Sequence, residues 1–210
     1  MSVAVEQLLQ QNSARLWRAR ETGSSAAAVA PTGLPTGYAA LDRCLPGAGW
    51  PRQGLVEILS DRRGIGELGL LLPALAALCR DEGGGWIAWV SPPYRPYAPA
   101  LAAWGIDVGR MLVVNGAGAT EWAMDQALRS ESCSAVLGWS NPRDPHALRR
   151  LQLAAEASRS LAVLYRPLQA GLTPSPAVLR LALLGGGTAG LQVRIVKSRG
   201  GRPATVNLGY

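Results

Sequence analysis

The sequence predicts an α/β fold with a mostly parallel sheet that ends in antiparallel hairpins. Between residues 55 and 165, short apolar runs of strand length alternate with longer helical stretches, a pattern typical of a parallel sheet with helices on both faces. From Val178 onward, strand-like runs follow one another across glycine turns, which favours antiparallel pairing. A length of 210 residues suffices for one sizeable domain with a short appendage.

The N-terminal part of the chain predicts a helix followed by a linker. Residues 3–21 carry apolar side chains, among them Trp17, at a loose helical spacing between polar ones. Residues 22–33 read TGSSAAAVAPTG, and such small, turn-forming residues predict a flexible linker. We therefore divide the chain into residues 1–33, a helix with a linker, and residues 34–210, the α/β domain.

The elements of this domain are expected in a fixed alternation. The five strands of the alternating part are Leu55–Leu59, Trp86–Val90, Met111–Val114, Ala135–Trp139 and Leu161–Tyr165. The helices between them are Glu67–Asp81, Tyr97–Trp104, Glu121–Ser130 and Pro145–Ser158. Pro73 predicts a kink or an irregular turn in the first helix. Three more strands, Val178–Leu184, Leu191–Lys197 and Thr205–Leu208, close the chain as hairpins.

Composition excludes several classes of protein. No run approaches the ~18 uncharged apolar residues of a membrane span, and the N-terminus lacks the order of a signal peptide, so we expect a cytoplasmic protein. Cys44, Cys79 and Cys133 are widely spaced, which argues for reduced thiols and against a metal site or a disulfide framework. His146 is the only histidine, which excludes mechanisms that need two imidazoles. We expect no metal and no cofactor.

The segment after the first strand has the glycines of a phosphate-binding loop without its charged residues. A P-loop has the form GxxxxGK[ST], because backbone amides cradle the phosphates, the lysine neutralises them and the hydroxyl ligates magnesium. Gly64 and Gly66 lie between a strand and a helix, but Glu67 stands in place of the lysine and Leu68 in place of the hydroxyl residue. A carboxylate repels a triphosphate, and leucine cannot bind magnesium. The loop is therefore predicted to be degenerate.

The run LPTGYAALDRCLPGAGWPRQGLVEIL, which begins at Leu34, resembles the opening of RecA-type ATPase cores. The resemblance implies a RecA-like three-layer α/β/α core. In such cores the next strand ends in a glutamate that activates water, and a later strand ends in an aspartate that supports magnesium. The matching positions here hold Pro93 and Trp139. Since phosphoryl transfer needs charge neutralisation and a positioned metal, we predict no ATP hydrolysis, no catalytic residue and no enzyme.

Several further motifs narrow the resemblance. GIGEL followed by LLLPAL, then SPPYRPYAPAL, AVLGW, RRLQLAAEA with LAVLYRP, and KSRGGRP together resemble the ImuA family. These are RecA-like accessory proteins of error-prone translesion DNA synthesis in the bacterial SOS response, and they are grouped with the division inhibitor SulA. The likeness covers Leu34 to Pro203 and implies an adaptor that binds ImuB, RecA and, through them, an error-prone DNA polymerase.

Two other functions stay open at this point. The grouping with SulA implies FtsZ, the tubulin-like division protein, as a competing partner. A DNA-dependent ATPase that uses an unrecognised loop is the third possibility.

The net charge of +7 comes almost wholly from arginine, since Lys197 is the only lysine, and such a balance suits nucleic acid or acidic partners. Arg194, Lys197, Arg199 and Arg202 concentrate positive charge around a glycine turn, where backbone can approach phosphate closely. The interpretations are contact with single-stranded DNA, contact with an acidic partner, or a solvated turn.

Other arginines invite the same question. Arg62 and Arg63 occupy the degenerate loop, where they either bind an anion or pair internally with Asp61 and Glu67. Arg149 and Arg150 are expected on the surface of a helix whose Leu148, Leu151 and Leu153 face the sheet.

The tryptophans divide into two groups. Trp86, Trp89 and Trp139 fall on predicted core strands, so packing explains them. Trp17, on the N-terminal helix, and Trp50, in a Gly-Pro turn, are less easily buried, and exposed tryptophan often marks an interaction hot spot. We take these two as candidate partner anchors.

Overall fold

The computed structural model describes residues 32–81, 83–116, 118–185 and 190–209. All of them belong to one compact unit, Pro31–Tyr210. The helix predicted over residues 3–21, Trp17 and nearly all of the predicted linker lie outside the described residues.

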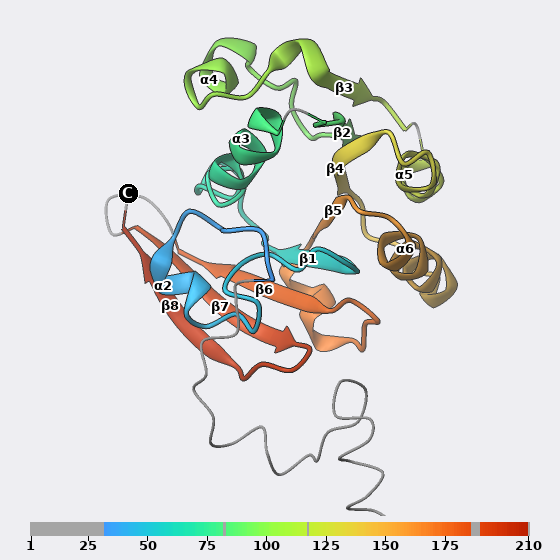
Figure 1. Ribbon diagram of the computed structural model, residues 1–210. Helices are drawn as coiled ribbons and strands as arrows, with labels where there is room; N and C mark the ends of the chain where they lie inside the picture. Colours follow the sequence, from blue (N-terminus) through green and yellow to red (C-terminus); the bar gives the residue numbers. More distant parts are fainter. Residues whose placement is uncertain (1–31, 82, 117, 186–189, 210) are drawn as a thin grey trace, which may run out of the picture. The chain divides into compact units, whose positions relative to one another are not determined.

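The described strands form one mixed sheet in the order β3-β2-β4-β5-β1-β6-β7-β8 (Figure 1). The six strands from β3 to β6 pair in parallel, while β6–β7 and β7–β8 pair antiparallel. The predicted parallel sheet with antiparallel C-terminal strands is thereby confirmed. The bounds are Leu55–Leu59 for β1, Trp86–Val90 for β2, Met111–Val114 for β3, Cys133–Trp139 for β4, Leu161–Arg166 for β5, Leu179–Leu184 for β6, Leu191–Ser198 for β7 and Ala204–Leu208 for β8.

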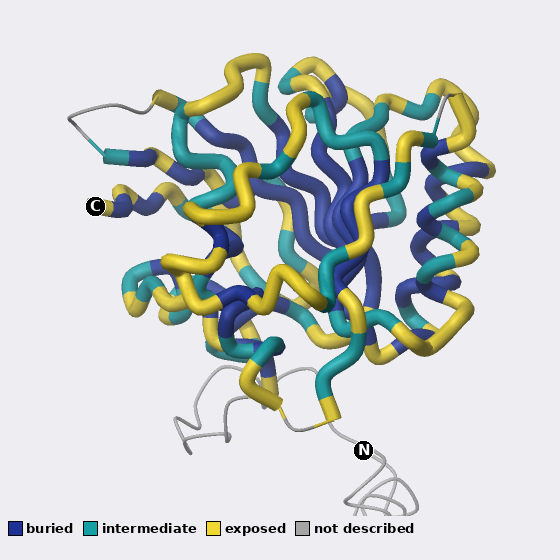
Figure 2. Tube along the Cα trace, turned by 90° about the horizontal axis from the view of Figure 1, so that it is seen from above, coloured by how far each residue is buried: buried dark blue, intermediate teal, exposed yellow. Residues whose placement is uncertain are grey.

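Helices pack against both faces of this sheet (Figure 1). Successive strand residues point to opposite faces, so in β1 Val56 and Ile58 join the apolar cluster that contains α2 (Ala39–Asp42) and α3 (Leu72–Arg80). Leu55 joins the cluster that contains α5 (Thr120–Arg129) and α6 (Pro145–Ala157). Figure 2 shows the central strands buried along their length, with α5 and α6 burying only one side. The remaining short helices are α4 (Ala98–Ala103), η2 (Val108–Arg110) and η3 (Leu168–Leu172).

The first predicted helix begins five residues later than expected. The stretch from Glu67 to Leu71 forms turns, held by bonds from Leu70 N to Gly66 O and from Leu71 N to Leu68 O, and α3 starts only at Leu72. Pro73 lies in the first turn of α3, where its missing N–H would be unpaired in any case. The prediction of a kink inside a longer helix is therefore wrong. The other prediction, an irregular turn, agrees with the turns that precede Pro73.

Three expectations about single side chains are also wrong. Trp86, at the start of β2, is 46% exposed, although Trp89 is buried as expected. Leu153 is 46% exposed because it lies on the outer side of α6, whereas Leu148 and Leu151 face the sheet. Trp50 is completely buried in the main core cluster, where its backbone pairs with Leu34. An accessible partner anchor at Trp50 is thus excluded.

None of the helices in the described part of the chain is long and apolar enough to cross a membrane. Within those residues, the structure contains no group of three or more His, Cys, Asp or Glu side chains that could hold a metal ion. The three cysteines are free and partly buried, and burial raises the pKa of the Cys133 thiol.

Candidate functional site

The loop between β1 and α3 holds the two glycines that the sequence analysis assigned to a degenerate phosphate-binding loop. Gly64 and Gly66 have φ angles of +72° and +101°, a left-handed conformation that glycine adopts without strain. The Glu67 side chain folds back into this loop, where its carboxylate accepts hydrogen bonds from the Gly64 amide at 2.9 Å and the Ile65 amide at 3.0 Å. Amides that a phosphate would use are therefore bonded to the protein's own carboxylate.

Leu68 does not supply the hydroxyl of a phosphate-binding loop. Leu68 packs against the main core cluster, so it presents an apolar side chain where magnesium would need a hydroxyl. With two loop amides bonded to Glu67 and neither an ammonium nor a hydroxyl at these positions, the residues do not fit a nucleotide with magnesium.

A pocket of about 420 Å³ opens beside this loop at the carboxyl ends of β1, β2, β4 and β5. Ligands of open α/β sheets bind at this end of the strands. The structure brings Glu67, Pro93 and Trp139 together in the lining. The three substituted positions, found separately in the sequence, therefore belong to one place in the fold.

The floor of this pocket is aromatic. The rings of Trp139 and Tyr165 stack with centroids 4.7 Å apart and an interplanar angle of 2°, and Trp89 stacks on the far side of Trp139 at 5.6 Å. Burial and the nearby Glu67 carboxylate raise the pKa of the Tyr165 phenol well above its usual value. The phenol therefore stays protonated, and it donates to the Glu67 carbonyl at 3.2 Å.

Arg62 and Arg63 are exposed at the mouth of the same pocket. Internal pairing with Asp61 and Glu67, one of the two interpretations drawn from the sequence, is wrong. Asp61 instead accepts a hydrogen bond from the Leu168 amide at 2.8 Å, and Glu67 is bonded to the loop amides. The Arg63 guanidinium lies over the Tyr94 ring, 5.8 Å from its centroid.

Sequence reasoning missed a buried charge network next to this pocket. Glu57 in β1 is completely buried and bonds to Arg166 at 3.0 Å and to Arg180 at 2.7 Å. Arg166 also donates to the side chain of Asn141, and Ser175 donates to Glu57. The sequence contained a signal for this network. Glu57 is the one acid in the apolar strand LVEIL, and the neighbouring apolar runs LAVLYR and LRLALL each contain one arginine, Arg166 and Arg180.

The four basic residues predicted around the β7–β8 turn do not form one cluster. Arg194 lines a separate hollow beside η3. Lys197 donates to the Ser175 carbonyl at 2.7 Å, and burial, followed by the charges of Arg180 and Arg199, lowers the pKa of its ammonium. Arg199 pairs with Glu156 at 3.1 Å. Arg202 is exposed on the turn.

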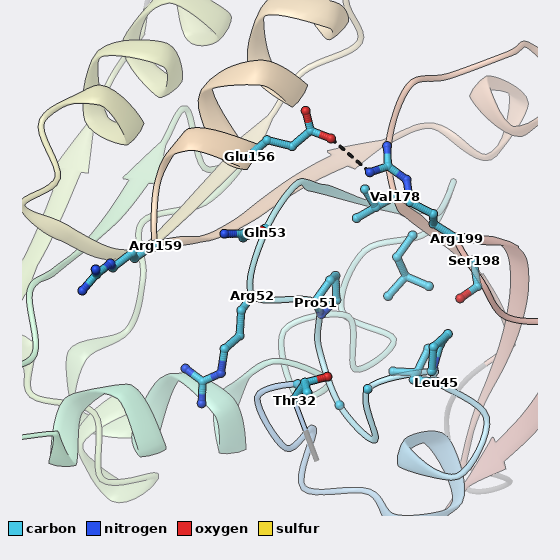
Figure 3. A pocket seen from close by; sticks show the side chains of 15 residues that line it. Thr32, Leu45, Pro51, Arg52, Gln53, Glu156, Arg159, Val178, Ser198 and Arg199 are labelled. Atoms are coloured by element: carbon cyan, nitrogen blue, oxygen red, sulfur yellow. Dashed lines mark hydrogen bonds and ion pairs between the residues drawn. The ribbon is translucent and has the colours of Figure 1, made fainter. Parts of the chain in front are cut away.

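Arg199 lies at the rim of a second, larger pocket of about 710 Å³ (Figure 3). Its lining includes the segment before β1 and the end of α6, so it lies at the amino ends of the central strands. Figure 3 shows the Glu156–Arg199 ion pair on one side and the side chains of Arg52 and Arg159 on the other. The two arginine-bearing loops predicted as contact sites thus open at opposite ends of the sheet.

The relatives described here carry the names SulA and ImuA. No family model matches the sequence. A cell division inhibitor SulA from Edwardsiella piscicida is 35% identical over 119 residues, which cover 56% of this chain and 70% of the relative. Protein ImuA from Caulobacter vibrioides is 30% identical over 129 residues, which cover 59% of this chain but only 52% of the relative. The chain thus spans about half the length of that ImuA.

A second SulA, from Photorhabdus laumondii, is 32% identical over 119 residues, covering 55% of this chain and 65% of the relative. Among solved structures, the crystal structure of SulA from Pseudomonas aeruginosa aligns with 53% of this chain and 97% of that chain, at 25% identity and a TM-score of 0.43. On the identity and coverage of the sequence relatives, the chain belongs to the family of proteins related to SulA and ImuA.

Proposed function

We propose that this protein is a non-catalytic accessory protein of SOS-induced error-prone translesion DNA synthesis, with a RecA-like core that binds ImuB and RecA in the cytoplasm. The observation that carries the non-catalytic part is the Glu67 carboxylate bonded to the Gly64 and Ile65 amides. A bound triphosphate would have to displace this carboxylate and would meet no lysine. The core therefore serves as a scaffold for partner contacts.

An ATPase assay tests the non-catalytic part. With radiolabelled ATP and single-stranded DNA, we expect no turnover above background for the wild type or for Glu67→Ala. DNA-stimulated turnover that Glu67→Ala abolishes would refute the proposal and favour a DNA-dependent ATPase. A crystal soaked with nucleotide and magnesium provides a second test. Electron density for both in the loop would contradict the role assigned to Glu67.

A second candidate is inhibition of cell division through FtsZ. The observation that favours it is the match to a SulA, which has the higher identity of the two kinds of relative, 35% against 30%. Both candidates are binding functions, and they differ only in the target.

Parallel pull-downs of the full chain with purified ImuB, RecA and FtsZ separate the two candidates. The accessory role predicts retention of ImuB and RecA, with FtsZ no better retained than an unrelated protein. Retention of FtsZ alone would replace the first candidate by the second. If none of the three is retained, both candidates fail.

A further inference from the structure

The pocket beside the degenerate loop contains two cationic side chains that form no ion pair with the acids of its lining. Within the described part of the chain, Arg62 and Arg63 form no ion pair with a carboxylate. The two acids that line the pocket, Asp61 and Glu67, are both committed to backbone amides. Additional carboxylates brought by a ligand would therefore find guanidinium groups free to bind them bidentately.

Aromatic surface lies next to these charges, both in the lining of the pocket and just outside it. Tyr94 is 69% exposed beneath the Arg63 guanidinium, and the partly buried Trp139 forms part of the lining. Arginine, tyrosine and tryptophan are the residues enriched at protein–protein hot spots, where a cluster in a hollow carries most of the binding energy. The composition matches a protein ligand with acidic and apolar side chains.

The size of the pocket disfavours nucleic acid. A volume of about 420 Å³ holds a few side chains rather than a run of nucleotides.

Contacts of Arg166 link strand ends that form the wall of the pocket. Arg166 lines the pocket at the end of β5 and donates hydrogen bonds to Glu57 and Asn141. These bonds connect β5 with β1 and with the segment that follows β4. A site whose walls do not rearrange loses less entropy when it binds.

We infer that this pocket docks an acidic segment of a partner protein, with its carboxylates on Arg62 and Arg63 and an apolar side chain against Tyr94 and Trp139. The inference rests on the proposed function, since it assigns a docking site to the proposed partner-binding adaptor.

NMR titration of the full chain tests the inference. The probe is a short synthetic peptide in which two glutamates flank a single leucine on each side, added to ¹⁵N-tryptophan-labelled protein. We expect the Trp139 indole signal to shift, while the buried Trp50 and the exposed Trp86 at the amino end of β2 stay unchanged. Arg62→Glu with Arg63→Glu should weaken binding by about tenfold or more.

The matched control is Arg149→Glu with Arg150→Glu, two exposed arginines on α6. This variant should bind the peptide as the wild type does, and an unchanged Trp50 signal reports that both variants are folded. Absence of a Trp139 shift overturns the inference. So does an equal loss in both variants, which would indicate diffuse charge attraction, or an equal Trp139 shift with a thymidine oligonucleotide, which would indicate a phosphate ligand.

Failure of this inference is distinguishable from failure of the proposed function. If the peptide does not bind but ImuB is retained in the pull-down, the adaptor stands and its docking site lies elsewhere. If the peptide binds and neither ImuB, RecA nor FtsZ is retained, the docking site stands and the assignment of partners is wrong.

Discussion

At the scale of the residue, one buried acid holds together the strand ends that carry the site. Glu57 has no exposed surface and bonds to two arginines, whose side chains are 4% and 5% exposed. A carboxylate in an apolar interior is strongly unfavourable unless it is paired and hydrogen-bonded. Removal of this charge would leave two guanidinium groups buried without their counter-ion, because Arg166 and Arg180 are fixed by other contacts.

We predict that Glu57→Gln lowers the free energy of unfolding by about 3–5 kcal/mol, the usual effect of breaking a buried ion pair from one side. Urea unfolding followed by tryptophan fluorescence measures it. Glu156→Gln is the matched control, since it removes a carboxylate from the solvent-exposed pair with Arg199, and exposed pairs contribute little. Similar losses for the two variants would show that the buried network does not stabilise the fold.

At the scale of the element, β4 and α5 approach each other more closely than a side chain on the strand would allow. A Cβ atom at Gly138 would lie 2.1 Å from Met124 Sδ, and Met124 on α5 is completely buried. The glycine therefore sets the distance between helix and sheet, and Trp139, the next residue, points to the opposite face and into the pocket floor.

Gly138→Ala should lower the unfolding free energy by about 1–3 kcal/mol through overpacking. Met124→Ala alone should also destabilise, because it leaves a cavity. The methyl group introduced by Gly138→Ala would partly fill the cavity left by Met124→Ala, and the smaller side chain at 124 would relieve the overpacking. The double variant should therefore lose less unfolding free energy than the sum of the two single variants, and thermal unfolding of all three variants gives the coupling energy. Strict additivity would mean that positions 138 and 124 are not energetically coupled.

The elements themselves were largely predictable. The alternation of apolar runs and helical stretches gave strand positions that differ from the structure by at most two residues at either end, because a parallel sheet buried on both faces requires continuous apolar strands. The start of α3 was not predictable, because the turn from Glu67 to Leu71 depends on loop contacts such as the bond from Tyr38 Oη to the Gly69 carbonyl.

At the scale of the whole molecule, positive charge is spread over separate surfaces. Arg62 and Arg63 open at the carboxyl ends of the central strands, while Arg199 opens at their amino ends. The net charge of +7 therefore does not describe one binding face. Two separate basic surfaces are what the proposed adaptor role would use for two partners.

The exposed β7–β8 turn is the remaining candidate for DNA contact. We predict that Arg199→Ala with Arg202→Ala lowers the affinity for single-stranded oligonucleotides and flattens its salt dependence, because each lost phosphate contact removes one released counter-ion. Fluorescence anisotropy at two salt concentrations checks this, with Arg62→Ala and Arg63→Ala as the comparison. An unchanged double variant would remove the turn from consideration.

The sequence by itself determined which residues of a P-loop this chain lacks. The missing P-loop lysine, with Glu67 and Leu68 in the loop, is local information, and so is the alternation that defines the sheet. Only the tertiary structure decided where the charges go: it placed the Glu67 carboxylate on the loop amides, left Arg62 and Arg63 without an internal acid, buried Trp50 and paired Glu57 with arginines more than 100 residues away. The packing of distant segments selects these side-chain contacts, and no short stretch of sequence encodes that packing.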